Sequence, residues 1–375
     1  MTQKQLGLIV NPVAGLGGSV ALKGSDGADT QAKALSLGAQ PRAQDRARHA
    51  LERIVPIRED VVLIAYPHDM GEDAARACGF EPQIIGSIRQ GKTTPQDTYR
   101  AAQEMLQRKV DLLLFAGGDG TARDIYQAIG LQLPALGIPA GVKIHSAVYA
   151  THPGAAGELA RLYLQGRVSS LREAEVMDVD EDAFRQGFVS ARLYGYLKIP
   201  FRTSLVQNLK MASVGGDVAV APLALDVAEG MEDGCLYIIG PGTTTRAIAD
   251  ELGIAKTLLG VDVVLNRKLL ATDVSESQIL RLLDEHRDST AKIVVTPIGG
   301  QGYIFGRGNQ QISAGVIERI GRENVVVVST REKLYSLGSQ PLRVDTGDPV
   351  VDDHLNGYMI VVTGYRERAV RKVAI

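Results

Sequence analysis

A strand, a glycine-rich turn and a helix follow one another without a break near residue 117. Residues 112–116 read Leu-Leu-Leu-Phe-Ala, an apolar run typical of a buried strand, and stop at Gly117-Gly118-Asp119-Gly120-Thr121. A helical pattern over 122–129 follows directly. The glycines allow a sharp turn and the close approach of a ligand, because no Cβ stands in the way. We expect Thr121 to cap the helix, whose N–H groups and dipole favour a bound phosphate.

Asp119 lies between these glycines, so its carboxylate is expected to face the same pocket as the phosphate. A carboxylate beside a phosphate is unfavourable unless it holds a metal ion or accepts a proton. Asp119 therefore indicates phosphoryl transfer rather than phosphate binding alone. The competing interpretation is a tight strand-to-helix turn in which Asp119 caps the helix, since short glycine motifs are not specific by themselves.

Length and charge restrict the class of protein. The 375 residues suffice for two domains, and the net charge of −2 provides no basic field for nucleic acid or an acidic membrane. We find neither a signal segment nor an apolar run near the roughly twenty residues that span a bilayer. The two cysteines, Cys78 and Cys235, lack metal or redox spacing and are expected to be reduced and buried. We therefore expect a cytoplasmic protein without nucleic-acid or membrane partners.

The first half alternates strands with helices. Apolar runs predict strands at 6–10, 61–65, 83–88, 110–115 and 135–138, with helices at 43–54, 73–78 and 94–108 between them. Such alternation implies a parallel, doubly wound α/β sheet, in which ligands collect beyond the carboxyl ends of the strands. The glycine-rich turns after Val10 and Phe115 both lie at such ends.

The second half has a different texture. A helix at about 157–164 and a connector at 166–173 precede short β patterns at 176–180, 191–199 and 218–225, which are typical of an antiparallel sheet. Strands at 236–239, 292–295, 325–329 and 358–363 and a helix at 246–251 follow. We expect an N-terminal α/β domain over residues 1–165, which carries the glycine-rich turn, and a β-rich mixed α/β domain over residues 166–375.

Two further loops of the first half could bind phosphate. Residues 11–19 read Asn-Pro-Val-Ala-Gly-Leu-Gly-Gly-Ser, which is glycine-rich but lacks a complete GxGxxG and an immediate helix, so a hydride-transferring dehydrogenase is poorly supported. The loop suits a phosphate or is a plain connection. In 137–146, Lys143 could supply positive charge and Ser146 could cap a helix. A solvated Lys143 and an incidental His145 are the alternative.

Glycine-rich loops that could bind a ligand also occur in the second half. In 240–246, threonine hydroxyls at a helix start suit phosphate or ribose oxygens, although a capped helix without ligand explains them equally. The segments 296–303 and 306–311 combine glycines with Gln, Asn and Arg, and amide side chains can recognise nicotinamide or adenine. An acidic stretch at 345–353 could attract a divalent cation, but such loops are more often solvated.

Together these loops resemble the ATP-NAD kinase family, within the wider group that includes diacylglycerol, sphingosine and 6-phosphofructokinases. The GGDGT of 117–121, the Asn-Pro of 11–12 and the Thr-Pro-Ile-Gly of 296–299 with Tyr303 are similar to signatures of that family. The runs IPAGVK, GPGTTT, GGQGYIFGRGNQQIS and PLRVDTGD resemble its divergent ATP-NAD kinase-like branch, which includes the acetoin-catabolism X proteins. Residues 177–182 differ from typical NAD kinases, because they lack the Asn-Glu pair that those enzymes carry early in the second domain.

The resemblance implies a Mg²⁺-dependent NAD kinase that transfers a phosphoryl group from ATP or polyphosphate to the 2′-hydroxyl of the adenosine ribose of NAD, giving NADP. It implies that Asp119 takes or orients the hydroxyl proton, and that the protein is a homo-oligomer. Metal ligands are not assigned. The residues expected to bind the phosphates of ATP are Asn11, Gly15, Gly17, Gly18, Gly117, Gly118, Gly120, Thr121 and Lys143. Those expected to bind NAD are Gly242, Thr243, Thr244, Thr296, Gly299, Gly300, Tyr303, Arg307, Asn309 and Gln310.

Two alternatives remain at this point. One is a kinase of the same fold that acts on another hydroxyl compound. The other is a nucleotide-binding protein without turnover.

Overall fold

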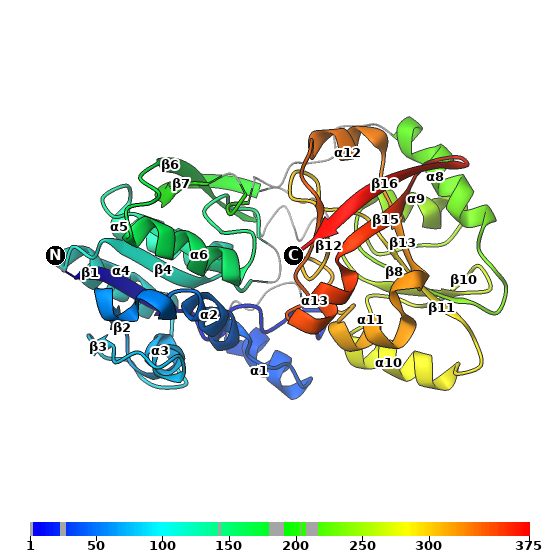
Figure 1. Ribbon diagram of the computed structural model, residues 1–375. Coiled ribbons are helices and arrows are strands. Elements are labelled where there is room, and N and C mark those ends of the chain that lie inside the picture. Colours follow the sequence, from blue (N-terminus) through cyan, green and yellow to red (C-terminus); the bar gives the residue numbers. More distant parts are fainter. Residues whose placement is uncertain (1–2, 23–27, 142–143, 180–190, 203, 208–216) are drawn as a thin grey trace. The chain divides into compact units, whose positions relative to one another are not determined.

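The computed structural model describes residues 3–22, 28–141, 144–179, 191–202, 204–207 and 217–375 (Figure 1). Contacts divide the chain into two compact units. The first comprises residues 1–16, 24–27 and 40–209, and the second comprises 17–23, 28–39 and 210–375. The boundary expected between residues 165 and 166 therefore precedes the division of contacts, because residues 166–209 pack with the first unit.

A five-stranded parallel sheet forms the centre of the first unit. In sheet order its strands are β3 (Gln83–Ile84), β2 (Val61–Ala65), β1 (Lys4–Val10), β4 (Leu112–Gly117) and β5 (Ala135–Pro139). The order reverses between β1 and β4, which is the topological switch point where open α/β sheets bind ligands. The predicted doubly wound parallel sheet is confirmed.

Helices cover this sheet in two pairs (Figure 1). Helices α2 (Ala43–Glu52) and α6 (Pro153–Leu164) pack against one another, and so do α4 (Pro95–Gln107) and α5 (Asp119–Ile129). Thr94 closes a capping box with Asp97, and Pro95 occupies the first turn, so α4 starts where the Thr-Pro pair predicted. Shorter elements are η1 (Val55–Asp60), η2 (His68–Met70) and α3 (Glu72–Ala77).

A two-stranded antiparallel hairpin completes the first unit. Its strands are β6 (Leu171–Val179) and β7 (Ala191–Pro200), and it packs on α5. The fit is close at Gly195, where an added Cβ would lie 2.1 Å from the Tyr126 ring of α5. This packing is the reason that residues 166–209 belong with the parallel sheet.

The second unit contains a nine-stranded mixed sheet. In sheet order its strands are β10 (Lys268–Ala271), β9 (Asp262–Leu265), β8 (Leu236–Ile239), β11 (Ala291–Val295), β13 (Val325–Val328), β15 (Gly357–Gly364), β16 (Glu367–Ala374), β14 (Leu342–Val344) and β12 (Tyr303–Phe305). Strands β8, β11, β13 and β15 pair in parallel, whereas β8–β9–β10 and β15–β16 are antiparallel. The β-rich mixed class is confirmed.

Neighbouring residues of the central strands enter two different cores. Ile238, Val327 and Val361 pack with α10 (Glu276–Glu285), α11 (Ala314–Ile320) and α13 (Pro349–Leu355). Ile239, Val328 and Val362 pack with α8 (Asp217–Glu229) and α9 (Thr243–Glu251). Because alternate residues of a strand face opposite sides, the sheet carries helices on both faces. The remaining elements are α1 (Ala28–Ser36), α12 (Arg331–Ser336) and η3 (Arg322–Asn324).

The strand expected at 218–225 is wrong, because this segment belongs to helix α8. Leu223, Ala224 and Val227 are buried, and their spacing matches one face of a helix rather than alternation along a strand. Burial of that face outweighs the β-branched residues and Pro222 inside the helix.

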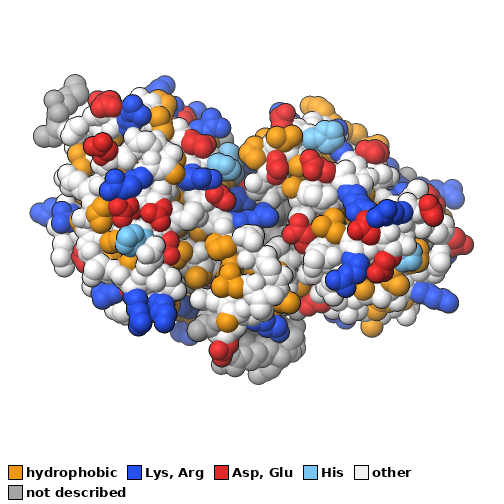
Figure 2. Space-filling model, turned by 90° about the horizontal axis from the view of Figure 1, so that it is seen from below, with side chains coloured by type: hydrophobic (Ala, Val, Ile, Leu, Met, Phe, Trp, Pro, Cys, Tyr) orange, Lys and Arg blue, Asp and Glu red, His pale blue; other side chains and the backbone are white. Residues whose placement is uncertain are grey.

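Three further observations concern the surface charge, membrane-spanning helices and the two cysteines. On the face shown in Figure 2, basic side chains are interspersed with acidic ones, as the net charge of −2 leads one to expect. Among the described residues, no helix combines the length and apolarity needed to cross a bilayer. Cys235 is buried, whereas Cys78 is only partly buried.

We predict that Gly157→Ala destabilises the first unit. A Cβ at Gly157 would lie 1.9 Å from the carbonyl oxygen of Ala50 and force α6 away from α2. Overpacking of this kind costs about 1–3 kcal/mol. The control is Gly154→Ala in the same helix, whose Cβ would meet only side-chain atoms at 3.2 Å or more. The midpoint of urea unfolding should be lower for Gly157→Ala than for the unmodified protein and unchanged for Gly154→Ala. Equal midpoints would contradict the packing.

Candidate active site

The ends of β1 and β4 are joined by a side chain at the switch point. The N–H of Asn11 donates to the carbonyl of Ala116 at 2.9 Å, and Asn11 Nδ2 donates to Thr121 Oγ1 at 2.9 Å. Asn11 thus ties the loop after β1 to the first turn of α5. The structure brings together the two glycine-rich turns that the sequence placed at strand ends.

Helix α5 begins differently from the expectation. Gly118 is the N-cap residue, without a side-chain cap, and Asp119 is the first helical residue. Thr121 lies inside the first turn, so its predicted capping role is wrong. Its hydroxyl accepts from Asn11 instead, and its side chain fills the space beside Gly117, where an added Cβ would lie 2.4 Å from Thr121 Oγ1.

Three hydrogen-bond donors and one ring nitrogen of His145 converge on the Asp119 carboxylate. Oδ1 accepts the N–H of Ser146 at 3.0 Å and its hydroxyl at 2.7 Å. Oδ2 accepts the N–H of His145 at 2.7 Å and lies 3.1 Å from His145 Nδ1. The side chains of Asp119 and His145 are only 5% and 6% exposed. A buried carboxylate requires such partners, so Asp119 anchors the segment that follows β5.

Other contacts fix the same segment on the GGDGT turn. The carbonyl of Gly117 accepts the N–H groups of Ala140 and Gly141, and Tyr149 donates its hydroxyl to the Gly118 carbonyl at 2.5 Å. Ser146 Oγ accepts the Met177 N–H at 2.9 Å. No helix starts at Ser146, because its hydroxyl is used in these bonds, and the next helix is α6. Lys143 lies outside the described residues.

The glycines of the loop after β1 serve close packing. Gly15 has φ +77°, and a Cβ there would lie 2.1 Å from the carbonyl oxygen of Ala140. Gly18 lies in the second unit, where a Cβ would lie 1.4 Å from Gln310 Oε1. Gly17 also belongs to the second unit. The predicted Gly15–Gly18 loop is therefore split between the two units.

In the second unit, the turn before α9 meets the turn after β11. Gly242 is the N-cap of α9, and a Cβ on it would lie 3.0 Å from Thr296 Cγ2. Lys333 Nζ donates to Thr296 Oγ1 at 3.0 Å. Thr243 begins α9 and Thr244 is buried. Lys333 was not singled out from the sequence, since a lysine in the first turn of a helix gives no signal.

Several residues of 299–310 are built into the fold. Tyr303 is buried in β12, and the Arg307 guanidinium lies 4.3 Å from its ring centroid and 3.8 Å from Asp345 Oδ2. Gly299 and Gly300 form the turn that precedes β12. Asn309 Nδ2 donates to the Ile304 carbonyl at 2.8 Å, whereas its buried Oδ1 has no hydrogen-bond partner in the described part of the protein. Among the described side chains predicted to bind NAD in this segment, the Asn309 amide oxygen could still accept a hydrogen bond.

Acidic side chains of the stretch at 345–353 form hydrogen bonds that stabilise the local fold. Asp348 caps α13, and Asp352 Oδ1 accepts the N–H and hydroxyl of Thr346 at 2.9 and 2.7 Å. Within the described ranges, no group of three or more His, Cys, Asp or Glu side chains is arranged to hold a metal ion. The metal interpretation of this loop therefore gains no support.

Two family models match the chain, one in each half. The ATP-NAD kinase N-terminal domain matches residues 6–168, and the ATP-NAD kinase C-terminal domain matches residues 232–373. The chain belongs to the ATP-NAD kinase family. The resemblance inferred from the sequence motifs is confirmed.

Comparisons with individual proteins add little to the family assignment. No curated protein sequence matches the chain. A diacylglycerol kinase from Bacillus anthracis str. Sterne is 21% identical, with 48% of each chain covered and a TM-score of 0.23. A UDP-N-acetylglucosamine 2-epimerase is 11% identical, with 95% of this chain and 90% of that chain covered and a TM-score of 0.27. The chain thus spans about half the length of the diacylglycerol kinase.

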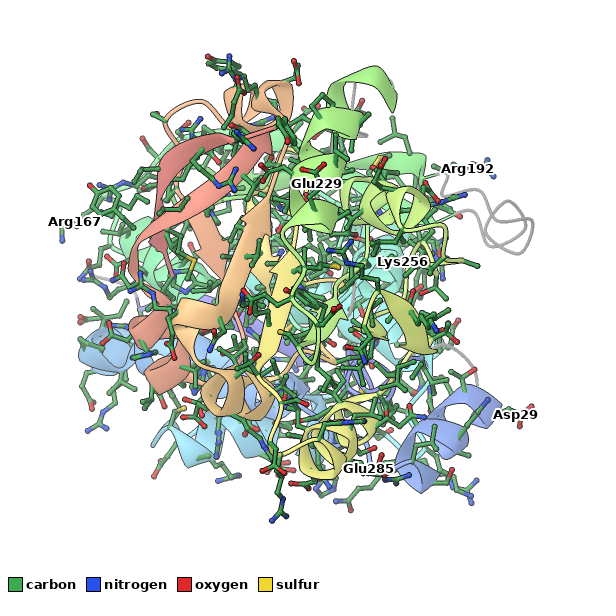
Figure 3. The ribbon with its side chains drawn as sticks, turned by 90° about the vertical axis from the view of Figure 1, so that its right-hand side faces the viewer. Asp29, Arg167, Arg192, Glu229, Lys256 and Glu285 are labelled. Atoms are coloured by element: carbon green, nitrogen blue, oxygen red, sulfur yellow. The ribbon has the colours of Figure 1, made fainter. Side chains whose placement is uncertain are left out.

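In this member of the ATP-NAD kinase family, a buried lysine supports the turn at Gly242. Lys256 is labelled in Figure 3, and its Nζ donates to the carbonyls of Thr257 and Gly260 and lies 3.7 Å from Asp262 Oδ2. The neighbouring Leu258 carbonyl accepts the Gly242 N–H at 2.9 Å. Burial lowers the pKa of Lys256 to about 8, although Asp262 acts in the opposite direction.

We predict that Lys256 makes the second unit more stable at alkaline pH. Burial destabilises the folded state while the Lys256 amine is charged. This destabilisation is lost as the pH rises from about 8, the pKa in the folded protein, to 10.5, the pKa in the unfolded chain. The free energy of unfolding should gain up to about 3 kcal/mol over this range. Urea midpoints at pH 7.5 and 10 measure it, and Lys256→Met should abolish the gain.

The control is Lys292→Met. The pKa of Lys292 is raised, chiefly by its hydrogen bond to Glu232, so its contribution to stability is lost rather than gained as the pH rises. An unchanged alkaline slope in Lys256→Met would contradict the assignment to Lys256.

Proposed function

We propose that this protein transfers a phosphoryl group from ATP or polyphosphate to the 2′-hydroxyl of the adenosine ribose of NAD, giving NADP. The observation that carries the proposal is the match of both ATP-NAD kinase domains along one chain. It is supported by the position of the GGDGT turn at the switch point of the sheet, between β1 and β4.

The GGDGT turn suits the phosphoryl donor. Residues 119–121 form the first turn of α5, whose backbone N–H groups and dipole attract an anion. The charge of the whole chain is close to neutral, so this local field is what attracts a polyphosphate. We assign Gly117, Gly118, Gly120 and Thr121 to the donor phosphates, with Asn11 holding the turn in shape.

Mg²⁺ belongs to the proposal through the donor, because magnesium in phosphoryl transfer is held largely by substrate phosphates. Asp119 does not fit as its ligand in the observed arrangement, since both carboxylate oxygens accept bonds from residues 145 and 146.

The second unit supplies the proposed dinucleotide-binding groups. The start of α9, with Gly242, Thr243 and Thr244, offers backbone N–H groups, and Lys333 brings a cation to Thr296. Asn309 offers a buried amide oxygen that could accept from an adenine or nicotinamide amino group. These groups are the ones we expect to recognise NAD.

The test is a panel of acceptors that includes NAD, NADH, a polyol and a diacylglycerol, incubated with ATP or polyphosphate and Mg²⁺ and analysed by mass spectrometry. We expect a phosphate-sized gain on NAD. A gain only on another acceptor would replace the substrate and retain the kinase. Tight NAD binding by calorimetry without any product would favour the non-catalytic alternative.

In the same assay, Asp119→Asn should abolish NADP formation. An amide presents a donor where the carboxylate accepts from His145 or Ser146, so kcat should fall by about 10²–10⁴ while NAD binding persists. The matched control is Asp111→Asn at the opposite end of β4, where the carboxylate binds Lys4 at 2.7 Å. Near-wild-type turnover of Asp119→Asn would overturn the role of Asp119.

Lys333→Met should weaken NAD binding. Loss of the cation beside Thr296 should raise the KM for NAD about tenfold, equivalent to about 1.4 kcal/mol, with kcat nearly unchanged. Lys292→Met, four residues before Thr296 on the preceding strand, is the control. Steady-state kinetics distinguish the two, and a fall in kcat at constant KM would contradict a binding role for Lys333.

A further inference from the structure

The loop that follows α9 returns to the start of the same helix. Helix α9 ends at Glu251, and the next strand, β9, begins at Asp262, which pairs with Ile239 at the end of β8. On its way the loop passes the turn before α9, where the Leu258 carbonyl accepts the Gly242 N–H at 2.9 Å. Gly242 has φ +125°, a conformation that other residues rarely adopt. The shape of the helix start therefore depends on the path of the loop.

Two buried charges fix this path. The side chains of Lys256 and Asp262 are only 1% and 0% exposed. The Lys256 ammonium donates to the carbonyls of Thr257 at 2.8 Å and Gly260 at 3.2 Å, which flank Leu258 in the loop. Asp262 accepts the N–H of Thr257 at 2.7 Å and its hydroxyl at 2.8 Å. The backbone on both sides of Leu258 is thus held by charged groups.

Stability alone does not explain the buried amine. Burial lowers the pKa of Lys256 to about 8, so the fold disfavours the charged form even though Asp262 acts in the opposite direction. Well-packed hydrophobic residues in place of a buried ion pair are often neutral or stabilising. One attested use of such buried groups is to fix one conformation among several. Residues 257–259 are partly buried rather than enclosed, so without the ammonium their carbonyls could turn to water.

The turn held in this way presents groups that suit an anion. Thr243 and Thr244 are the first two residues of α9, so their N–H groups have no acceptor within the helix. Thr244 is 2% exposed, and its hydroxyl bonds to no group in the described part of the protein. The Thr245 hydroxyl, in contrast, donates to the carbonyls of Gly240 and Gly242. A ligand oxygen at the helix start would satisfy both the N–H groups and the Thr244 hydroxyl.

We propose that Lys256 is a positioning residue for dinucleotide binding, whose ammonium holds the loop so that the Leu258 carbonyl keeps Gly242 and the first turn of α9 in the shape that receives the diphosphate of NAD. The inference rests on the proposed function and names the part of NAD that this helix start binds. Lys256 acts through the loop, because its ammonium is enclosed by two carbonyls and a carboxylate.

The first measurement is hydrogen exchange, which needs no activity. Lys256→Met keeps the length of the side chain and removes the donors, so the Gly242 amide should lose its protection. Exchange in β4 of the first unit should not change. The control is Lys268→Met, which removes an exposed lysine of β10 and should leave Gly242 protected. Unchanged protection of Gly242 in Lys256→Met would show that the ammonium does not hold the turn and would overturn the proposal.

The second measurement is the steady-state kinetics of NADP formation. Lys256→Met should raise the KM for NAD about tenfold and leave kcat and the KM for ATP within a few fold, because the donor phosphates are assigned to the first unit. A purely structural role would reduce the folded fraction and hence kcat, without a selective change in one KM. A fall in kcat at constant KM for NAD would therefore contradict the positioning role.

Chemical rescue tests whether the charge matters. Lys256→Ala removes three carbons and the ammonium, which together correspond to n-propylammonium. This ion should restore the KM for NAD toward that of the unmodified protein, whereas n-propanol and sodium chloride at equal concentration should not. Equal rescue by n-propanol, or no rescue by either compound, would overturn the role of the ammonium.

The outcomes separate this inference from the proposed function. If the unmodified protein binds NAD without turnover, the Kd for NAD replaces KM in both comparisons. If it neither binds nor phosphorylates NAD, the proposed function fails and this inference fails with it. If it forms NADP and Lys256→Met keeps the KM for NAD, only the positioning role is overturned.

Discussion

The attachment of the segment after β5 to the GGDGT turn is the interaction on which the candidate active site depends. Removing a carboxylate from water is costly, and Asp119 is stabilised by three donors from two consecutive residues. The N–H groups of His145 and Ser146 can both point at the carboxylate only when the backbone of these two residues adopts the observed conformation. Asp119 thereby positions His145 and Ser146, and Gly117 and Tyr149 add bonds between the same segments.

The proposed phosphate binding does not require a basic protein as a whole. The positive ends of α5 and α9 are made by backbone N–H groups, which act over a few ångströms and do not change the charge of the chain. Basic side chains that serve the fold are paired within their own unit, as Arg123 is with Asp178 and Lys256 with Asp262. Anion recognition can therefore be local in a protein with a mixed surface.

Much of the fold follows from the sequence, since β2 and β8 occupy the ranges that their apolar runs predicted and α4 starts at its Thr-Pro pair. Failures occur where tertiary contacts override local pattern. Helix α8 forms because it buries one face on the sheet, and Ser146 bonds Asp119 instead of capping a helix. The GGDGT turn and Asn11 could be predicted as neighbours. Lys333 could not, because a lysine in the first turn of a helix gives no signal that it contacts Thr296.

Two buried polar groups of the second unit differ in how far the fold satisfies them. Arg307 stacks on Tyr303 and faces Asp345, so its charge is compensated within the fold. Asn309 uses its amide nitrogen on the Ile304 carbonyl, yet its buried oxygen lacks a partner among the described residues. An unmet acceptor costs about 1–3 kcal/mol, whereas a compensated charge can be purely structural. A ligand donor that reached Asn309 would recover that cost.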